Sequence, residues 1–153
     1  TFKTPRVIST YDINERYIIL PRGLYGKLKL FFKKHHVDVS VEDKRLRVKV
    51  PKENLSLRLR EEQEKAKNEI VKNDYALLIA PPGFGKTVVA ASVISERSVT
   101  TLILVHKTVL LDQWSKRLGE YYGIDLKSIG ILGKGKKKLN GRLDIATLQS
   151  LKN

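Results

Sequence analysis

The sequence has no cysteine and no methionine among its 153 residues, and it has a single tryptophan. Without cysteine there is no disulfide framework, no thiolate nucleophile and no cysteine-based metal site. The three histidines include one adjacent pair, His35 and His36, which we expect at the end of a helix. Long apolar runs are also lacking, because the longest fall far short of the roughly 18 to 20 residues that cross a bilayer. With no signal peptide at its start, we expect a cytoplasmic protein without a membrane partner.

Acidic residues are scarce relative to basic ones. Thirty Lys and Arg against 16 Asp and Glu give a net charge of +14, which favours a polyanionic partner such as nucleic acid or a phosphate-bearing ligand. An acidic membrane surface would suit the same charge, but no basic amphipathic helix flanks an apolar span. A hydrophobic content of 41% allows one ordinary core with a small second unit, so we expect one or two domains.

The segment APPGFGKT, at Ala80–Thr87, lies between two apolar runs. Tyr75–Ala80 follows the turn-forming pair Asn73-Asp74 and has the length of a strand buried on both faces. Small and branched residues resume at Thr87–Ser95 and predict a helix. Strand, glycine-rich loop and helix are the context of a phosphate-binding loop. In that loop the backbone N–H groups turn inward, and the helix N-terminus adds its partial positive charge.

The segment matches the Walker A pattern G-x-x-x-x-G-K-[ST] except at its first position, where Ala80 stands in place of glycine. Lys86 would reach the β and γ phosphates of ATP, and the Thr87 hydroxyl would bind Mg²⁺. We therefore predict Lys86 and Thr87 as catalytic residues. The predicted nucleotide-binding residues of the loop are Pro82, Gly83, Phe84, Gly85, Lys86, Thr87 and Val88. The alternative is a plain strand-to-helix turn whose lysine is an ordinary surface charge.

The chain after the loop alternates strands and helices. We predict strands at Thr101–Val105, Ser128–Leu132 and Leu143–Thr147, and a helix at Thr108–Tyr122. Apolar residues recur every four positions along that helix, so one face is buried, and we expect Trp114 in the core. This alternation predicts an α/β fold with a doubly wound parallel sheet, in which ligands bind beyond the carboxyl ends of the strands. His106 and Lys107 fall at such an end.

A basic segment, GKGKKKLNGR at Gly133–Arg142, joins the last two predicted strands. Five of its ten residues are Lys or Arg, and three are glycine. A charge run of this kind is typical of a solvated linker. Its position at the same edge as the phosphate loop favours nucleic-acid binding instead. Both interpretations remain open at this point.

Four segments together resemble a known family. Their order and spacing are similar to those of the first RecA-like domain of superfamily II helicases, above all the branch of XPB, UvsW and restriction-enzyme subunits. The segments are LREEQ at Leu59–Gln63, APPGFGKT at Ala80–Thr87, LILVHKTVLLDQW at Leu102–Trp114 and DIATLQSL at Asp144–Leu151. The resemblance covers residues 57–151. It implies an incomplete RecA-like, parallel-sheet P-loop domain over residues 56–153, with ATP and Mg²⁺ as cofactors.

The resemblance also assigns site residues. Gln63 matches the glutamine with which the family recognises the adenine edge, a role suited to an amide with one donor and one acceptor group. Other matching positions would contact the backbone of DNA, or alternatively RNA, without sequence recognition. With the basic segment, the predicted nucleic-acid-binding residues are His106, Lys107, Thr108, Lys134, Lys136, Lys137, Thr147 and Gln149.

Two parts of the family pattern do not occur in the sequence. One is the apolar strand ending in Asp-Glu, whose carboxylates hold Mg²⁺, and the other is the second, C-terminal RecA-like domain with its arginine finger. Because phosphoryl transfer depends on positioning and charge neutralisation, their loss should abolish turnover. We therefore expect an N-terminal fragment that binds nucleotide weakly at best and does not hydrolyse it.

The first 55 residues predict a separate small, basic α+β domain. Residues 1–50 carry 12 basic and 5 acidic side chains, so +7 of the net charge lies there. We predict strands at Arg6–Thr10 and Tyr17–Leu20, a helix opening at Pro21, and a hairpin of Val37–Val41 with Leu46–Val50. The segment resembles the module that precedes the helicase core in the XPB and UvsW branch and engages duplex DNA. A solvated face packed against the rest of the protein is the alternative.

Two other functions remain as alternatives. A non-enzymatic nucleic-acid-binding module with a vestigial P-loop would show DNA binding that ATP does not change. A P-loop enzyme that remodels proteins or acts as a kinase would have no use for the basic segment.

Overall fold

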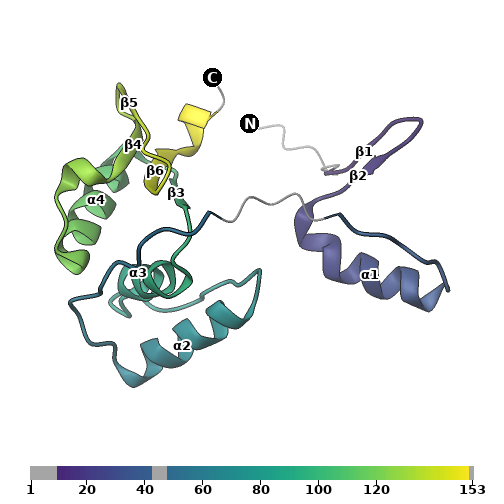
Figure 1. Cartoon of the computed structure of the whole chain (residues 1–153), viewed down its shortest axis with the longest axis horizontal. Coiled ribbons are helices and arrows are strands. Elements are labelled where there is room, and N and C mark those ends of the chain that lie inside the picture. Colours follow the sequence, from purple (N-terminus) through teal and green to yellow (C-terminus); the bar gives the residue numbers. More distant parts are fainter. Residues whose placement is uncertain (1–9, 43–47, 152–153) are drawn as a thin grey trace, which may run out of the picture. The chain divides into compact units, whose positions relative to one another are not determined.

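The computed structural model describes residues 10–42 and 48–151, and the chain forms two compact units that divide between Lys44 and Arg45. The described part of the first unit begins with a short antiparallel hairpin of β1 (Asp12–Ile13) and β2 (Ile18–Ile19) (Figure 1). The Asn14 side-chain oxygen closes its turn by accepting hydrogen bonds from the backbone N–H groups of Arg16 and Tyr17. Asparagine favours such turns because its side chain bonds nearby backbone groups.

A helix follows the hairpin, as the sequence predicts. The 3₁₀ helix η1 (Arg22–Leu24) leads into α1 (Tyr25–Lys34), and His35 is the C-cap residue, which confirms the expected place of the histidine pair. None of the residues of α1 is buried, and Leu30 is 69% exposed. Within its described residues, this unit therefore has an apolar helix face without a core beneath it.

The hairpin predicted for Val37–Val41 and Leu46–Val50 is not found among the described residues, and its Leu46 and Arg47 lie outside them. The described residues 37–42 form no strand. Val48–Val50 instead lies antiparallel to Ser98–Thr100, with Lys49 bridged to Val99 and two backbone hydrogen bonds of 3.0 Å beside the bridge. Alternation of apolar residues identifies an extended segment but does not specify its partner, which here is distant in sequence. The predicted strand Arg6–Thr10 lies outside the described residues except for Thr10.

The second unit is built on a four-stranded sheet in the order β3-β6-β4-β5 (Figure 1). Its strands are β3 (Thr101–Val105), β4 (Gly130–Gly133), β5 (Lys136–Lys138) and β6 (Leu143–Thr147). Strand β6 is parallel to both β3 and β4, while β5 is antiparallel to β4. The predictions for β3 and β6 are confirmed. Strand β4 starts two residues later than predicted because the 3₁₀ helix η2 (Leu126–Ser128) occupies the preceding residues.

Three helices accompany this sheet: α2 (Glu61–Lys72), α3 (Lys86–Arg97) and α4 (Thr108–Tyr122). Helix α4 has its predicted bounds and packs on the sheet through Leu111 and Leu118, which are fully buried, with Trp114 partly buried against the same core. The Tyr122 hydroxyl donates a 2.6 Å hydrogen bond to the Ala91 carbonyl and so ties α4 to α3. Burial, together with the nearby charge of Glu53, raises the pKa of this phenol, so it stays a neutral donor.

The buried strand predicted at Tyr75–Ala80 is wrong. The segment has no strand structure, and Leu77 and Ile79 are 83% and 86% exposed. A strand needs a hydrogen-bonded neighbour, and no described strand pairs with this segment. The apolar sequence predicts a buried segment, but no described element covers Leu77 and Ile79.

The core of the second unit can be tested at Leu118. Leu118→Ala should lower the free energy of unfolding by about 3 kcal/mol, because it leaves a cavity in a close-packed site. Leu102→Ala, on a half-exposed side chain of β3, is the control and should cost less than about 1 kcal/mol. Urea unfolding followed by Trp114 fluorescence measures both. Equal losses in the two variants would contradict this account of the core.

Candidate functional site

The glycine-rich loop leads directly into α3, as the Walker A pattern predicts. Gly83 has φ +80°, and Gly85, the N-cap residue of α3, has φ +89° and ψ +38°. These are conformations that glycine adopts without strain and that side-chain-bearing residues rarely adopt. The loop therefore turns back on itself just before a helix N-terminus, where free backbone N–H groups and the helix dipole favour an anion.

Lys86, the predicted phosphate-binding lysine, is exposed at the first position of α3. Its ammonium donates hydrogen bonds to the carbonyls of Ala80 at 2.8 Å and Pro81 at 2.9 Å. The charge therefore lies against the beginning of its own loop. Thr87, the predicted Mg²⁺ ligand, follows it and is half-buried. Of the other predicted loop residues, Phe84 and Val88 are half-buried, and Pro82 is exposed.

Gln63 lies against this loop, from the first turn of α2. Its side chain is only 6% exposed. The amide Oε1 accepts from the Arg60 N–H at 3.0 Å, and Nε2 donates to the Phe84 carbonyl at 2.7 Å. The structure thus brings the predicted adenine-binding residue together with the predicted phosphate loop. Both polar groups of the amide are engaged within the chain.

Arg60 is a loop contact that sequence reasoning missed. Its guanidinium Nη2 donates to the same Phe84 carbonyl at 2.7 Å, and its Nε lies 3.2 Å from Glu62. An arginine in a charged helix start carries no pattern that distinguishes it from a surface residue. The one signal in the sequence is the position of Arg60 three residues before Gln63, at the start of the same helix, α2. This spacing could have suggested its contact with the loop.

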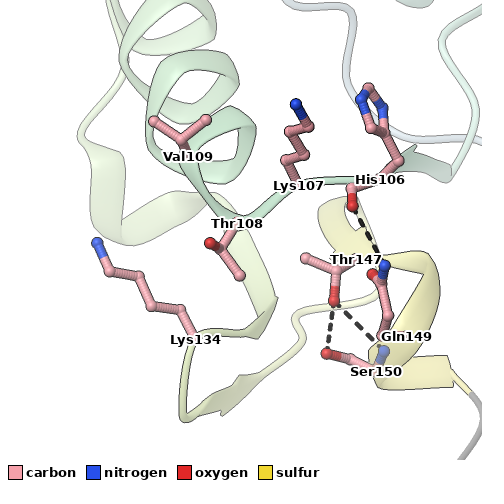
Figure 2. A pocket seen from close by; sticks show the side chains of 8 residues that line it. All are labelled: His106, Lys107, Thr108, Val109, Lys134, Thr147, Gln149 and Ser150. Carbon is pink, nitrogen blue, oxygen red and sulfur yellow. Dashed lines mark hydrogen bonds between the residues drawn. The ribbon is translucent and has the colours of Figure 1, made fainter.

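A second site lies at the carboxyl ends of β3 and β6, in a pocket of about 530 Å³ (Figure 2). Its lining residues are His106, Lys107, Thr108, Val109, Lys134, Thr147, Gln149 and Ser150. Six of the eight predicted nucleic-acid-binding residues are among them. The other two, Lys136 and Lys137, lie on β5 with exposed side chains and do not line the pocket. Val109 and Ser150 were not predicted.

Hydrogen bonds within the chain shape the floor of the pocket (Figure 2). Gln149 Nε2 donates to the His106 carbonyl at 3.2 Å and so joins the ends of the two parallel strands. Thr147 is only 3% exposed, and its hydroxyl lies 2.7 Å from that of Ser150. The predicted contact at Thr147 is therefore a buried hydroxyl that positions Ser150, while Gln149 keeps an exposed side chain.

Lys134 reaches the pocket from the tight turn between β4 and β5. Its backbone has φ +54°, and its ammonium donates a 2.6 Å hydrogen bond to Asp112 Oδ2 on α4. This hydrogen bond and the charge of Lys134, with a smaller contribution from Lys136, hold the pKa of Asp112 below its ordinary value. An ammonium at the mouth of the pocket is thus held by one carboxylate from the neighbouring helix.

The basic segment forms the turn and the second strand, β5, of an antiparallel hairpin with β4. Asp144, buried in β6, accepts hydrogen bonds of 2.9 Å from the N–H groups of Asn140 and Gly141 and so anchors the far end of the segment. Gly130 is required for this arrangement, because a Cβ there would lie 1.8 Å from Asp144 Oδ1. Strand β5 was not predicted, since three consecutive lysines do not resemble a strand.

Two other properties of the described residues bear on the site. They contain no group of three or more His, Asp or Glu arranged to hold a metal ion. None of their helices combines the length and apolar character that spanning a bilayer requires.

The sequence is similar to that of one protein family and to two individual proteins. Residues 56–153 match the sequence profile of the family described as type III restriction enzyme, res subunit. The chain is 35% identical over 85 residues to DNA 3'-5' translocase XPB2 of Sulfurisphaera tokodaii, covering 56% of this chain and 19% of that protein. It is 26% identical over 79 residues to probable helicase D10 of Escherichia phage T5, covering 52% of this chain and 17% of that protein. The matched region thus spans less than a fifth of either relative.

A solved structure shares the fold. The UvsW helicase from bacteriophage T4 superposes with a TM-score of 0.61 at 17% identity, covering 90% of this chain and 57% of that one. This similarity confirms the predicted fold class, an α/β RecA-like arrangement, with a sheet that contains parallel strands and one antiparallel strand, β5.

The contact between Lys134 and Asp112 predicts a titration. Lys134→Ala should raise the pKa of Asp112 toward its ordinary value, and Lys136→Ala should raise it less, because Lys134 supplies the larger effect. Since the pKa of Asp112 is lowered in the folded state, this pair stabilises the fold above the unfolded-state pKa. The contribution disappears as pH falls through the folded-state pKa. Carboxyl-detected NMR titration measures it, and an unchanged pKa in Lys134→Ala would show that the ion pair does not form in solution.

Proposed function

Because this chain belongs to the family described as type III restriction enzyme, res subunit, we propose that it is the N-terminal part of an ATP-dependent superfamily II DNA helicase or translocase. One observation carries the proposal. The loop with two positive-φ glycines precedes the N-terminus of α3 and accepts a hydrogen bond from Gln63, so the amide proposed to bind the base lies beside the loop proposed to bind phosphate. ATP fits such a pair of features because it carries a purine edge and a chain of phosphates.

In this proposal each loop residue binds a different part of Mg-ATP. Lys86 exchanges the carbonyls of Ala80 and Pro81 for the β and γ phosphates, while the N–H groups at the start of α3 bind phosphate oxygens. The Thr87 hydroxyl, at the second position of α3, is the residue that would hold Mg²⁺. The metal, when bound, neutralises charge on the phosphates.

The pocket at the ends of β3 and β6 is proposed to bind a nucleic-acid backbone. It gathers His106, Lys107 and Lys134 with the amide of Gln149, which are groups that donate to phosphate oxygens. Such contacts hold a strand without reading its sequence. DNA is the proposed substrate, with RNA as the alternative. Lys136 and Lys137 would extend the basic surface along β5.

The whole enzyme needs more than these residues. We propose residues 1–55 as a DNA-engaging accessory segment and residues 56–153 as part of the first RecA-like domain, although the compact units divide earlier, between Lys44 and Arg45. ATP would bind between this domain and a second RecA-like domain, closing the cleft, and hydrolysis would reopen it. Because the sequence contains no apolar strand ending in Asp-Glu, we expect residues 1–153 alone to bind nucleotide without hydrolysing it.

Nucleotide binding is tested first at Lys86. Lys86→Ala should weaken binding of ADP or ATP with Mg²⁺ by at least about tenfold, because it removes a charged donor to phosphate oxygens. Isothermal titration calorimetry measures the affinity. Lys65→Ala is the matched control, since Lys65 lies on α2 in an exposed ion pair with Glu61 and should leave the affinity unchanged. Equal affinities for wild type and Lys86→Ala would remove the loop from the proposal.

Backbone binding by the pocket predicts a change in salt dependence. Lys107→Ala and Lys134→Ala should each reduce the slope of log affinity against log salt for a short duplex by about one. Lys116→Ala, an exposed lysine of α4 outside the pocket, should leave the slope unchanged. Fluorescence anisotropy with a labelled duplex measures all three. Equal slopes in all variants would exclude the pocket as the binding site. Duplex binding that neither ATP nor Lys86→Ala alters would favour the non-enzymatic module.

A further inference from the structure

The Phe84 carbonyl, in the middle of the glycine-rich loop, is held by two donors from the start of α2. Arg60 Nη2 and Gln63 Nε2 each donate to it at 2.7 Å. A carbonyl oxygen has two lone pairs, so these two bonds use its full capacity as an acceptor. One of them is charge-assisted, which makes it the stronger of the two. We call this arrangement the Phe84 clamp.

The clamp fixes the orientation of a whole peptide unit. In a trans peptide the C=O of Phe84 and the N–H of Gly85 point in opposite directions. With the carbonyl bonded to α2, the Gly85 N–H must point away from α2. The following residue is glycine with φ +89°, which has no Cβ to oppose rotation of this peptide. Without the clamp, the unit could therefore turn over at little cost.

The two donors differ in whether nucleotide binding would break their hydrogen bonds. The Gln63 amide has both polar groups engaged within the chain. Recognition of an adenine edge would require it to give up at least one of these bonds. The hydrogen bond from Arg60 to the Phe84 carbonyl need not break when the base binds, so it would remain while Gln63 changes partners. Arg60 can also hold Glu62 through Nε at the same time, because its planar guanidinium donates in several fixed directions.

We propose that Arg60 is a positioning residue of the phosphate loop, which keeps the Phe84–Gly85 peptide oriented for phosphate binding while Gln63 is free to engage the base. The consequence for ligand binding rests on the proposed nucleotide function, whereas the orientation of the loop does not. Arg60 itself touches no phosphate in this account.

The first experiment measures the loop without any ligand. The N–H of Phe84 donates to the Pro81 carbonyl, and that of Val89 donates to the Gly85 carbonyl. In Arg60→Ala, hydrogen exchange of these two amides should become about tenfold faster, because one charge-assisted bond no longer holds the loop. The control is Arg58→Ala, which removes another exposed arginine side chain, two residues before Arg60. It should leave both exchange rates unchanged. Unchanged exchange in Arg60→Ala would overturn the proposal.

The second experiment separates the phosphate cradle from base recognition. Calorimetric titrations compare Mg-ADP with inorganic tripolyphosphate, which has no base. Arg60→Ala should weaken both ligands by a similar factor of about ten, whereas Gln63→Ala should weaken ADP more than tripolyphosphate. Arg60→Lys keeps the positive charge but loses the planar guanidinium with its several donors. Its affinity should therefore lie between those of Arg60→Ala and wild type. Full restoration by lysine, or an equal loss in Arg58→Ala, would show a general charge effect and overturn the positioning role.

The two experiments also separate this inference from the proposed function. If the wild-type chain binds neither ADP nor tripolyphosphate, the nucleotide function fails. The exchange rates of Arg60→Ala then still decide whether the clamp orients the loop. Since the Arg60 side chain is 56% exposed, its replacement should not disturb the core, and an unchanged circular dichroism spectrum verifies this.

Discussion

Strand β6 is the constraint on which the second unit depends. It is the only described strand with parallel hydrogen-bonded neighbours on both sides, and all five of its residues are buried. Because parallel strands end at the same edge, pairing with β3 brings His106 and Lys107 beside Thr147 and Gln149. The same strand carries Asp144, which anchors the basic hairpin. One buried strand therefore sets both the floor of the pocket and the position of its lysines.

The two candidate sites share a physical feature: the polar groups proposed to bind a ligand already have partners within the chain. Lys86 bonds the carbonyls of its own loop, Gln63 bonds Phe84, and Lys134 bonds Asp112. These bonds restrict the side chains before any ligand binds, which would reduce the entropy lost in the proposed binding. A ligand must also replace them, which favours groups such as phosphates that offer several strong acceptors at once.

The parts of the fold that the sequence predicted are those whose information is local. The bounds of α4 and β6 follow from their own apolar periodicity and length, and the turn into α3 follows from the glycine pattern of the loop. The failures concern pairing over long distances. Val48–Val50 pairs with Ser98–Thr100, which no local pattern specifies, and Tyr75–Ala80 forms no strand in the described sheet despite its apolar sequence. Five of the eight pocket residues follow from the family resemblance and Lys134 follows from the basic segment, whereas Val109 and Ser150 were not predicted. Arg60 was not predicted either, because a contact between a surface arginine and a carbonyl carries no distinctive sequence pattern.

The position of β3 at the end of the described sheet has a consequence for handling the chain. Its backbone groups on the side away from β6 have no described strand beside them, and Leu102 and Leu104 are about half exposed. Exposed edges with apolar side chains are templates for pairing with other chains, which natural proteins usually blunt with charge or cover. The net charge of +14 opposes close approach of copies through mutual repulsion, and salt weakens that repulsion. High salt should therefore lower this protein's resistance to aggregation, and it should also weaken the proposed binding of a phosphate backbone.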